Sequence, residues 1–282
     1  MNSLSLPSGR SIPALGLGTW RMGESRAART AEVGAVRSAI EMGYRLFDTA
    51  EMYGEGGAEQ VLGQAVADAL RAGDVRRDEL FIVSKVYPHN ASRKGTVAAN
   101  ERSRKRLGLD CIDLYLLHWR GELALTDTVA AMHELIEGGR ILHWGVSNFD
   151  VDDMTELQAV AGDCASNQVY FSLGERGPEF DLLPWQRRQR MPLMAYSPIG
   201  QGQLSRHEGL AAIAAAEGLT AAQLALAWVL SVPGVLAIPK AVKTEHMRDN
   251  LAAAGHTLAA DTRARLDRLF PPPTRKQALA MT

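Results

Sequence analysis

Short apolar runs alternate with longer amphipathic stretches along the whole of the 282-residue chain. Several of the short runs are nearly continuous in apolar residues, which is the pattern of strands buried on both faces of a parallel sheet. We therefore expect eight β-strands. They span residues Leu15–Thr19, Tyr44–Thr49, Leu80–Val86, Ile112–His118, Ile141–Ser147, Asn167–Tyr170, Leu193–Ser197 and Val235–Pro239.

The stretches between these strands carry the spacing of amphipathic helices. Apolar residues recur at helical intervals from Val61 to Leu70, and Gly73 follows as a stop signal. The same pattern returns over residues 126–138, 152–160 and 244–254, where Asp127 and Thr244 are candidate helix caps.

Eight strand–helix units in succession, without a long linker, predict a closed (β/α)8 barrel of the TIM-barrel class. We expect it to form a single domain over residues 1–282, and a doubly wound open sheet is the alternative. The segment LSLPSGRSIPALG predicts a hairpin that turns at Ser8 and Gly9 and plugs the barrel floor. Residues 261–270 predict an extra C-terminal helix, which Pro271 ends.

The most apolar stretch, Leu219–Val235, is too short and too interrupted by polar residues for a membrane span. We expect a buried helix followed by a turn.

Composition and net charge indicate which kinds of partner the protein binds. The chain is 46% hydrophobic and 22% charged, with a formal net charge of -1, so we expect a globular protein that binds neither nucleic acid nor membrane. Cys111 and Cys164 are too few for a disulfide framework, and no Cys/His spacing indicates a metal site. The N-terminus lacks the pattern of a secretory signal, so we expect a cytoplasmic protein.

Polar residues that close apolar strands are the candidates for chemistry, because the active site of a parallel barrel lies at the C-terminal ends of its strands. Asp48, Lys85 and His118 each close a strand, and Tyr53 follows Asp48 by five residues. Each residue also has a purely structural interpretation. Asp48 and Lys85 could form a structural ion pair, His118 could be a histidine of the core, and Tyr53 could be an aromatic residue of a loop.

Together these residues predict an acid. A buried lysine and a buried aspartate each cost several kcal/mol unless they are paired. A lysine cation beside a phenol favours the phenolate, so we expect Lys85 to lower the pKa of Tyr53 from about 10 toward neutrality. Asp48 would hold Lys85 in place.

The chain resembles the aldo-keto reductase superfamily over nearly its whole length. The matching segments, in the family's order, are GLGTW, FDTAEMYG, VSK, LLHW, GVSNF, NQVY, YSP and AIPKAV with the later DN. The resemblance implies reduction of aldehydes and ketones to alcohols with NADPH, and NADH is the alternative cofactor. Tyr53 would be the proton donor, Lys85 and Asp48 its tuning pair, and His118 a neutral hydrogen-bond donor to the carbonyl. No metal is required.

The resemblance also implies a set of cofactor contacts. Ser147, Asn148 and Gln168 would bind the nicotinamide carboxamide, and Tyr196 would stack on the ring. The remaining contacts fall at the nicotinamide ribose (Gly18, Thr19 and Trp20), the pyrophosphate (Ser197, Ile199 and Gln201) and the adenosine end (Lys240, Ala241, Val242, His246, Asp249 and Asn250).

The adenosine end departs from the commonest family pattern. Lys240 is present for a 2′-phosphate, but Ala241 stands where many relatives have serine, and His246 replaces the usual arginine. A lysine offers one point charge where arginine offers a planar fork, so we expect weaker recognition of the phosphate.

Trp20, Met52 and Trp119 are candidates for an apolar substrate pocket, whereas Trp144 lies inside a strand and is expected in the core. The loops Trp119–Asp127 and Ser197–His207 are short. We expect an open pocket for small aldehydes, as in the bacterial methylglyoxal-reducing members that the chain resembles.

Two other functions stay open. Potassium-channel β-subunits resemble this family and act largely by binding a partner, but we expect no docking extension in this chain. In an aldolase-like barrel Lys85 would form a Schiff base, which Asp48 disfavours by keeping the amine protonated. We expect a monomer or weak dimer that acts on a small carbonyl compound.

Overall fold

The computed structural model describes residues 2–281, and its eight parallel strands form the predicted barrel. Each strand pairs with its neighbour in the chain, so the sheet order never reverses as it would in the doubly wound alternative. The strands are β3 (Leu17–Gly18), β4 (Leu46–Asp48), β5 (Phe81–Val86), β6 (Ile112–Leu117), β7 (Ile141–Ser147), β8 (Asn167–Tyr170), β9 (Leu193–Tyr196) and β10 (Val235–Ala237).

The barrel closes where the first strand segment meets the last. The Gly16 amide donates to the Ala237 carbonyl at 2.9 Å, and the Gly18 amide donates to the Pro239 carbonyl at 3.1 Å. A Cβ at Gly18 would lie 2.8 Å from the Ile238 carbonyl oxygen, which is too close for any larger residue. Glycine at this position therefore permits the closure.

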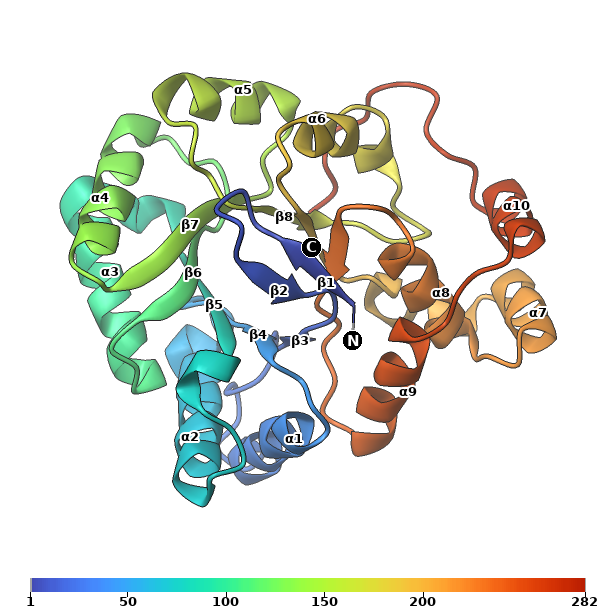
Figure 1. Ribbon diagram of the computed structural model, residues 1–282, viewed down its shortest axis with the longest axis horizontal. Helices are drawn as coiled ribbons and strands as arrows, with labels where there is room; N and C mark the ends of the chain where they lie inside the picture. Colours follow the sequence, from blue (N-terminus) through green and yellow to red (C-terminus); the bar gives the residue numbers. More distant parts are fainter. Residues whose placement is uncertain (1, 282) are drawn as a thin grey trace.

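Eight helices surround the barrel in the order of the strands that precede them (Figure 1). They are α1 (Arg29–Glu41), α2 (Gly57–Ala72), α3 (Arg93–Leu107), α4 (Leu125–Glu137), α5 (Val151–Val160), α6 (Leu182–Arg188), α8 (Ala221–Leu230) and α9 (Thr244–Ala254). Within residues 2–281, six short 3-10 turns lie in the loops between strands and helices, at residues 53–56, 77–79, 88–90, 177–179, 200–202 and 204–206.

Two further helices lie outside this ring. The extra C-terminal helix is present as α10 (Ala260–Leu269), and it packs against α7 (Glu208–Ala216), which we did not single out from the sequence. The predicted capping roles of Asp127 and Thr244 are wrong, because both residues lie inside the first turn of their helices. A cap must precede that turn.

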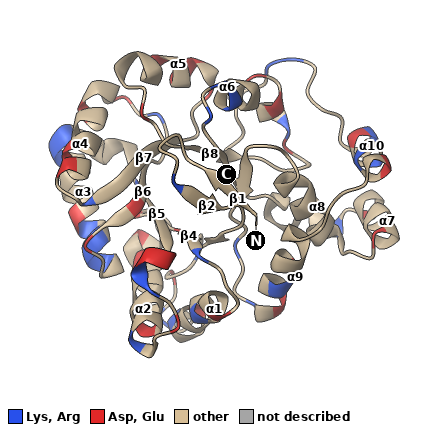
Figure 2. Ribbon diagram, in the orientation of Figure 1, with Lys and Arg blue, Asp and Glu red and all other residues tan. Residues whose placement is uncertain are grey.

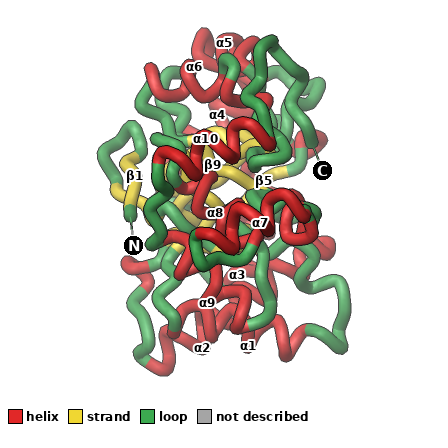
Figure 3. The backbone as a smooth tube through the Cα atoms, turned by 90° about the vertical axis from the view of Figure 1, so that its right-hand side faces the viewer, coloured by secondary structure: helices red, strands yellow, loops and turns green. Residues whose placement is uncertain are grey.

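The N-terminal hairpin is the predicted plug. Its strands β1 (Ser3–Ser5) and β2 (Ser11–Pro13) pair antiparallel, and Gly9 has the positive φ of +87° that the turn requires. Leu6 and Ile12 are buried among side chains inside the barrel, including those of Val83 and Leu114. Figure 3 shows the hairpin at one end of the barrel and the C-terminal tail running to the other.

Most apolar side chains fill the layer between the strands and the helices. Trp144 is buried there, as expected, and so is Trp228 of α8, the helix predicted within the most apolar stretch. The charged residues of Figure 2 lie mainly on the outer helices and loops. Among residues 2–281 no single helix is long and apolar enough to cross a membrane, although α7 and α8, bent by 78°, pass the length and composition test as a pair.

The hairpin yields a test of the fold. Ile12→Ala removes a fully buried side chain from the barrel floor, so we expect urea unfolding to show a loss of about 2–5 kcal/mol in the free energy of unfolding. Leu4→Ala, at a half-buried position of β1, is the control and should cost less. Equal effects of the two changes would show that the hairpin does not plug the barrel.

Candidate active site

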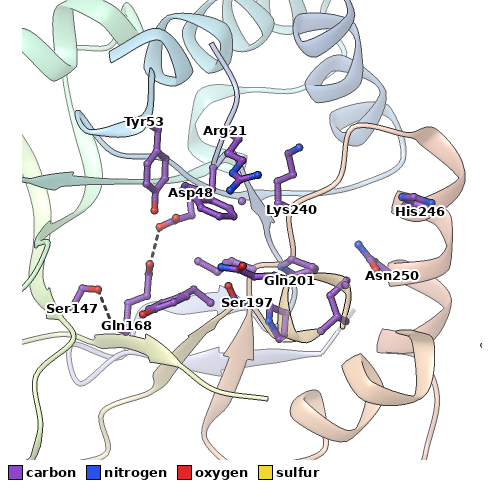
Figure 4. Close-up of a pocket in the computed structure, with 18 of the residues that line it drawn as sticks. Arg21, Asp48, Tyr53, Ser147, Gln168, Ser197, Gln201, Lys240, His246 and Asn250 are labelled. Atoms are coloured by element: carbon purple, nitrogen blue, oxygen red, sulfur yellow. Dashed lines mark hydrogen bonds between the residues drawn. The ribbon is translucent and has the colours of Figure 1, made fainter. Parts of the chain in front are cut away.

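A cavity of about 820 Å³ lies at the C-terminal ends of the strands, where the predicted catalytic residues converge. Tyr53 and His118 line one part of it, and Lys240, His246 and Asn250 line the other. Figure 4 shows Tyr53 and His246 well apart, on the loop after β4 and on α9. The cavity is therefore elongated enough to hold an extended ligand.

A buried ion pair stands beneath Tyr53. Lys85 Nζ lies 2.6 Å from Asp48 Oδ1, 2.9 Å from the Thr49 carbonyl oxygen and 3.1 Å from Tyr53 Oη. Asp48 Oδ2 accepts a hydrogen bond from Gln168 Nε2 at 2.8 Å, shown dashed in Figure 4. Each charge therefore has a partner, as burial of both groups requires.

The protonation of the pair follows from its surroundings. Burial lowers the pKa of Lys85, but the charges of Asp48 and Tyr53 outweigh burial and raise it, so the ammonium stays charged. Burial raises the pKa of Tyr53 more than Lys85 lowers it. Our expectation of a lowered Tyr53 pKa was wrong, because we omitted the cost of burying a phenolate. Tyr53 is therefore a protonated phenol at neutral pH, and its hydroxyl accepts from Lys85 and keeps its own proton available for donation.

His118 is neutral, as predicted. Burial and the nearby Lys85 charge lower its pKa well below the usual value. Its ring meets that of Tyr53 edge-on, with centroids 5.8 Å apart. Within residues 2–281, His118 Nδ1 is buried without a hydrogen-bond partner.

The loop that carries Tyr53 needs its glycines. Three consecutive residues, Gly54, Glu55 and Gly56, have positive φ values of +56°, +52° and +87°. On one side the loop touches the Gly23 backbone, where a Cβ on Gly54 would lie 2.9 Å from the Gly23 carbonyl carbon. The sequence YGEG makes this tight path sterically accessible.

The predicted carboxamide contacts form one hydrogen-bonded group. Ser147 Oγ donates to the Gln168 carbonyl at 2.8 Å, and Asn148 Nδ2 donates to the His118 carbonyl at 3.1 Å. Tyr196 Oη donates to Asn148 Oδ1 at 2.9 Å, and the Tyr196 ring stacks on Tyr170 with centroids 5.7 Å apart. These four predicted residues line the cavity.

The other predicted cofactor contacts divide into two groups. Gly18, Trp20, Ser197, Ile199, Gln201, Lys240, His246, Asp249 and Asn250 line the cavity. Thr19, Ala241 and Val242 lie outside its lining. Thr19 Oγ1 instead donates to the Asp48 carbonyl at 3.0 Å, and the side chains of Ala241 and Val242 pack against the core between strands and helices, so a cofactor contact of these three residues stays a prediction.

Sequence reasoning missed several lining residues. They are Arg21, Pro198, Gly202, Ser205, Ala222, Gln223, Ile238, Pro239 and Met281. The sequence could have placed Gln223 at the start of a helix, because Thr220 and Gln223 have the spacing of a capping box. In the structure the Gln223 amide also donates to Asp249 Oδ1 at 3.0 Å. Met281 had none, since its place depends on the tail folding back across the barrel.

The predicted substrate residues Trp20, Met52 and Trp119 line the cavity beside Tyr53 and His118. Arg21 lies over the Trp20 ring, 4.4 Å from its centroid. The irregular tail brings Met281 to the same cavity, and Lys276 holds this tail by an ion pair with Asp152 at 2.7 Å.

The Schiff-base alternative for Lys85 does not fit this geometry. Its side chain is fully buried, and its ammonium binds Asp48, Thr49 and Tyr53. An amine that attacks a carbonyl must be neutral and must reach the substrate. Lys85 meets neither condition.

Comparisons with known proteins agree with this geometry. The chain is 48% identical to the methylglyoxal reductase YeaE of Escherichia coli K12, over 96% of this chain and 95% of that protein. It is 34% identical to a glyoxal reductase of Bacillus subtilis 168, over 95% of this chain and 92% of that protein. A crystal structure of an aldo/keto reductase from Klebsiella pneumoniae, in complex with NADP and acetate, superposes with a TM-score of 0.94, at 47% identity, covering 99% of each chain.

The family model described as "Aldo/keto reductase family" matches residues 14–270, from the segment before β3 to the end of α10. The match covers the closed barrel and every predicted catalytic residue. The chain belongs to the aldo/keto reductase family.

Proposed function

We propose that the protein reduces small aldehydes to alcohols with NADPH, and that Tyr53 is the proton donor. The observation that carries this proposal is the Tyr53 hydroxyl, 3.1 Å from the buried Lys85 ammonium and beside a neutral histidine in the cavity. The names of the similar methylglyoxal and glyoxal reductases support a small dicarbonyl substrate.

The residues of the cavity fit a nicotinamide dinucleotide. Amide and hydroxyl groups of Ser147, Asn148 and Gln168 lie near the catalytic end, and the cation of Lys240 lies toward α9. These are donors suited to a carboxamide and a phosphate, respectively. The K. pneumoniae relative with bound NADP supports the same cofactor here. When bound, NADPH supplies the hydride to the carbonyl carbon.

The chain's own residues handle the carbonyl oxygen. Tyr53 and His118 donate hydrogen bonds that hold this oxygen, and they stabilise the negative charge that develops on it. Tyr53 then gives up its proton, and the Lys85 ammonium stabilises the phenolate that remains. Asp48 keeps Lys85 charged and in place.

Three wider features belong to the same proposal. We propose one domain over residues 1–282, a monomer or weak dimer, and a cytoplasmic location, for which the free thiols of Cys111 and Cys164 are the support. The alternative of a regulatory subunit gains no specific observation from the described residues. Turnover of an aldehyde by the purified protein separates the two functions.

The proton donor is tested by Tyr53→Phe. This change removes the hydroxyl and leaves the ring, so we expect loss of nearly all methylglyoxal reduction and NADPH binding within about threefold of the parent. Steady-state kinetics and quenching of tryptophan fluorescence measure the two effects. Substantial turnover with an unchanged pH profile would remove Tyr53 from this role.

Because His118 is neutral in the folded protein, we expect the free energy of unfolding to depend on pH. Its pKa is lowered in the folded state, so below pH 6.5 the unfolded chain binds a proton that the folded chain does not. The free energy of unfolding should therefore fall by about 1 kcal/mol between pH 7 and pH 5.5 on account of this group. Urea unfolding of the parent and of His118→Asn at several pH values measures this decrease, since the variant should lose the part of the pH dependence that comes from His118. Identical slopes would mean that His118 protonates normally.

Cofactor choice is tested at the other part of the cavity. Lys240 and His246 line it, and the parent should prefer NADPH by a margin that salt reduces, because screening weakens an exposed charge contact. His246→Arg adds a charge-assisted hydrogen bond, so we expect the preference to widen about tenfold, mainly through the KM for NADPH. If the parent prefers NADH, or if the ratio does not move, these residues are not the phosphate site.

A further inference from the structure

The loop that carries Tyr53 is anchored by two glutamates, one on each side of it. Glu51 precedes Tyr53 by two residues and Glu59 follows it by six, and both carboxylates are buried. Between them run the three residues of positive φ, among them Glu55, for which this conformation is unfavourable. A loop with such a path holds one position only if its surroundings fix both ends.

Glu51 ties the start of the loop to the end of β5. Its Oε1 accepts hydrogen bonds from the Tyr87 amide at 2.8 Å and from Asn90 Nδ2 at 3.1 Å. Tyr87 follows Lys85 by two residues, so this carboxylate joins the Tyr53 loop to the strand that carries Lys85.

Glu59 ties the other end of the loop to the middle of β5. Its Oε1 accepts from Ser84 Oγ at 2.6 Å, and Ser84 directly precedes Lys85. Its Oε2 accepts from Arg106 Nε at 2.5 Å, and the exposed fraction of the Glu59 side chain is 0%. Such a charge needs its cationic partner.

Arg106 binds both glutamates at once. In addition to Glu59, its Nη2 lies 4.0 Å from Glu51 Oε2, and its side chain crosses the loop at Gly56, where a Cβ would lie 2.5 Å from Arg106 Cδ. The backbone under Arg106 is also close to α2, since a Cβ at Gly63 would lie 2.5 Å from the Leu107 carbonyl oxygen. The Arg106 side chain therefore packs against the loop, and its backbone is held in place by the close contact between α3 and α2.

We propose that Arg106 is a positioning residue for the reaction: by holding Glu51 and Glu59 together it keeps the Tyr53 hydroxyl at Lys85. This inference rests on the proposed function, because it assigns no new chemistry to the site. Arg106 acts through the loop and touches neither substrate nor cofactor; it fixes the distance over which the proton is donated. A displacement of about 1 Å at a reacting group lowers rates by as much as about 100-fold.

The test compares Arg106→Met with Arg102→Met. Arg102 lies one turn earlier on α3, and 49% of its side chain is exposed. Among the described residues its ion pair is with Glu51, Nη2 to Oε2 at 3.4 Å, so Arg102→Met removes one positive charge beside Glu51 and leaves the bridge between the two glutamates intact. We expect Arg106→Met to lower kcat for methylglyoxal about 10- to 100-fold and to leave the KM for NADPH within about threefold. Arg102→Met should keep kcat within about threefold. Arg106→Lys should fall between the two, since an ammonium keeps the charge but lacks the planar fork whose Nε and Nη2 reach separate carboxylates.

A purely structural role is separated by a second variant and a second readout. Arg106→Met with Glu59→Gln leaves no buried unpaired carboxylate, so its melting temperature should recover while its kcat stays low. Tyr53 faces Asp48, Lys85 and His118, and with the loop displaced from Lys85 the alkaline limb of alcohol oxidation, which needs the phenolate, should move to higher pH. Fluorescence titration with NADPH counts the folded sites in every variant.

Three outcomes would overturn the inference. The first is a kcat of Arg106→Met equal to that of Arg102→Met per folded site, and the second is recovery of kcat together with stability in the double variant. The third is a pH profile that does not move. A parent protein that reduces no aldehyde would instead contradict the proposed function, whatever the variants do.

Discussion

The ion pair between Lys85 and Asp48 is the constraint on which the site depends. Both side chains are almost fully buried, at the ends of the adjacent strands β4 and β5, and burying either alone would cost several kcal/mol. The parallel ladder pairs Asp48 with Val83, so Lys85 lies two residues further along β5 on the same face. Thr19, directly after β3, binds the Asp48 carbonyl, and Gln168 of β8 binds the second carboxylate oxygen. The charges of Lys85 and Asp48 therefore depend on the barrel, which brings these strands together around the pair.

The charge of Lys85 sets the behaviour of its neighbours. It acts with burial to keep His118 neutral, and it opposes burial at Tyr53. A partly buried phenol without a nearby cation would be a poor acid, because its phenolate would have no stabilising charge. Lys85 therefore matters most once the proton has left Tyr53.

The architecture was predictable from sequence because burial imposes a regular pattern. The eight strands, the hairpin with Gly9 and the extra helix α10 all follow from local periodicity and turn residues. Helix α7 and the tail that brings Met281 to the cavity were not, since their places depend on packing between segments distant in sequence. The predicted cap at Asp127 was wrong by three residues and that at Thr244 by one, because the exact end of a helix is less strongly determined by local pattern than its existence.

The catalytic residues and most of the cavity lining were also predictable from sequence. Tyr53, Lys85, Asp48 and His118 converge as expected because the ends of parallel strands meet, and most of the family's cofactor positions face one cavity. Thr19, Ala241 and Val242 lie outside the lining of this cavity, because the direction of each side chain depends on the path of the chain beyond its strand, which a motif does not give. The raised pKa of Tyr53 was missed because burial cannot be read from a motif.

The most direct test of the account is the ionisation of Tyr53 itself. Ultraviolet difference titration against Tyr53→Phe measures this ionisation in the parent and in a variant that combines Lys85→Met with Asp48→Asn. Lys85 lowers the pKa of Tyr53 more than Asp48 raises it, so the account predicts ionisation at a higher pH in the variant. Ionisation at the same or a lower pH would contradict it.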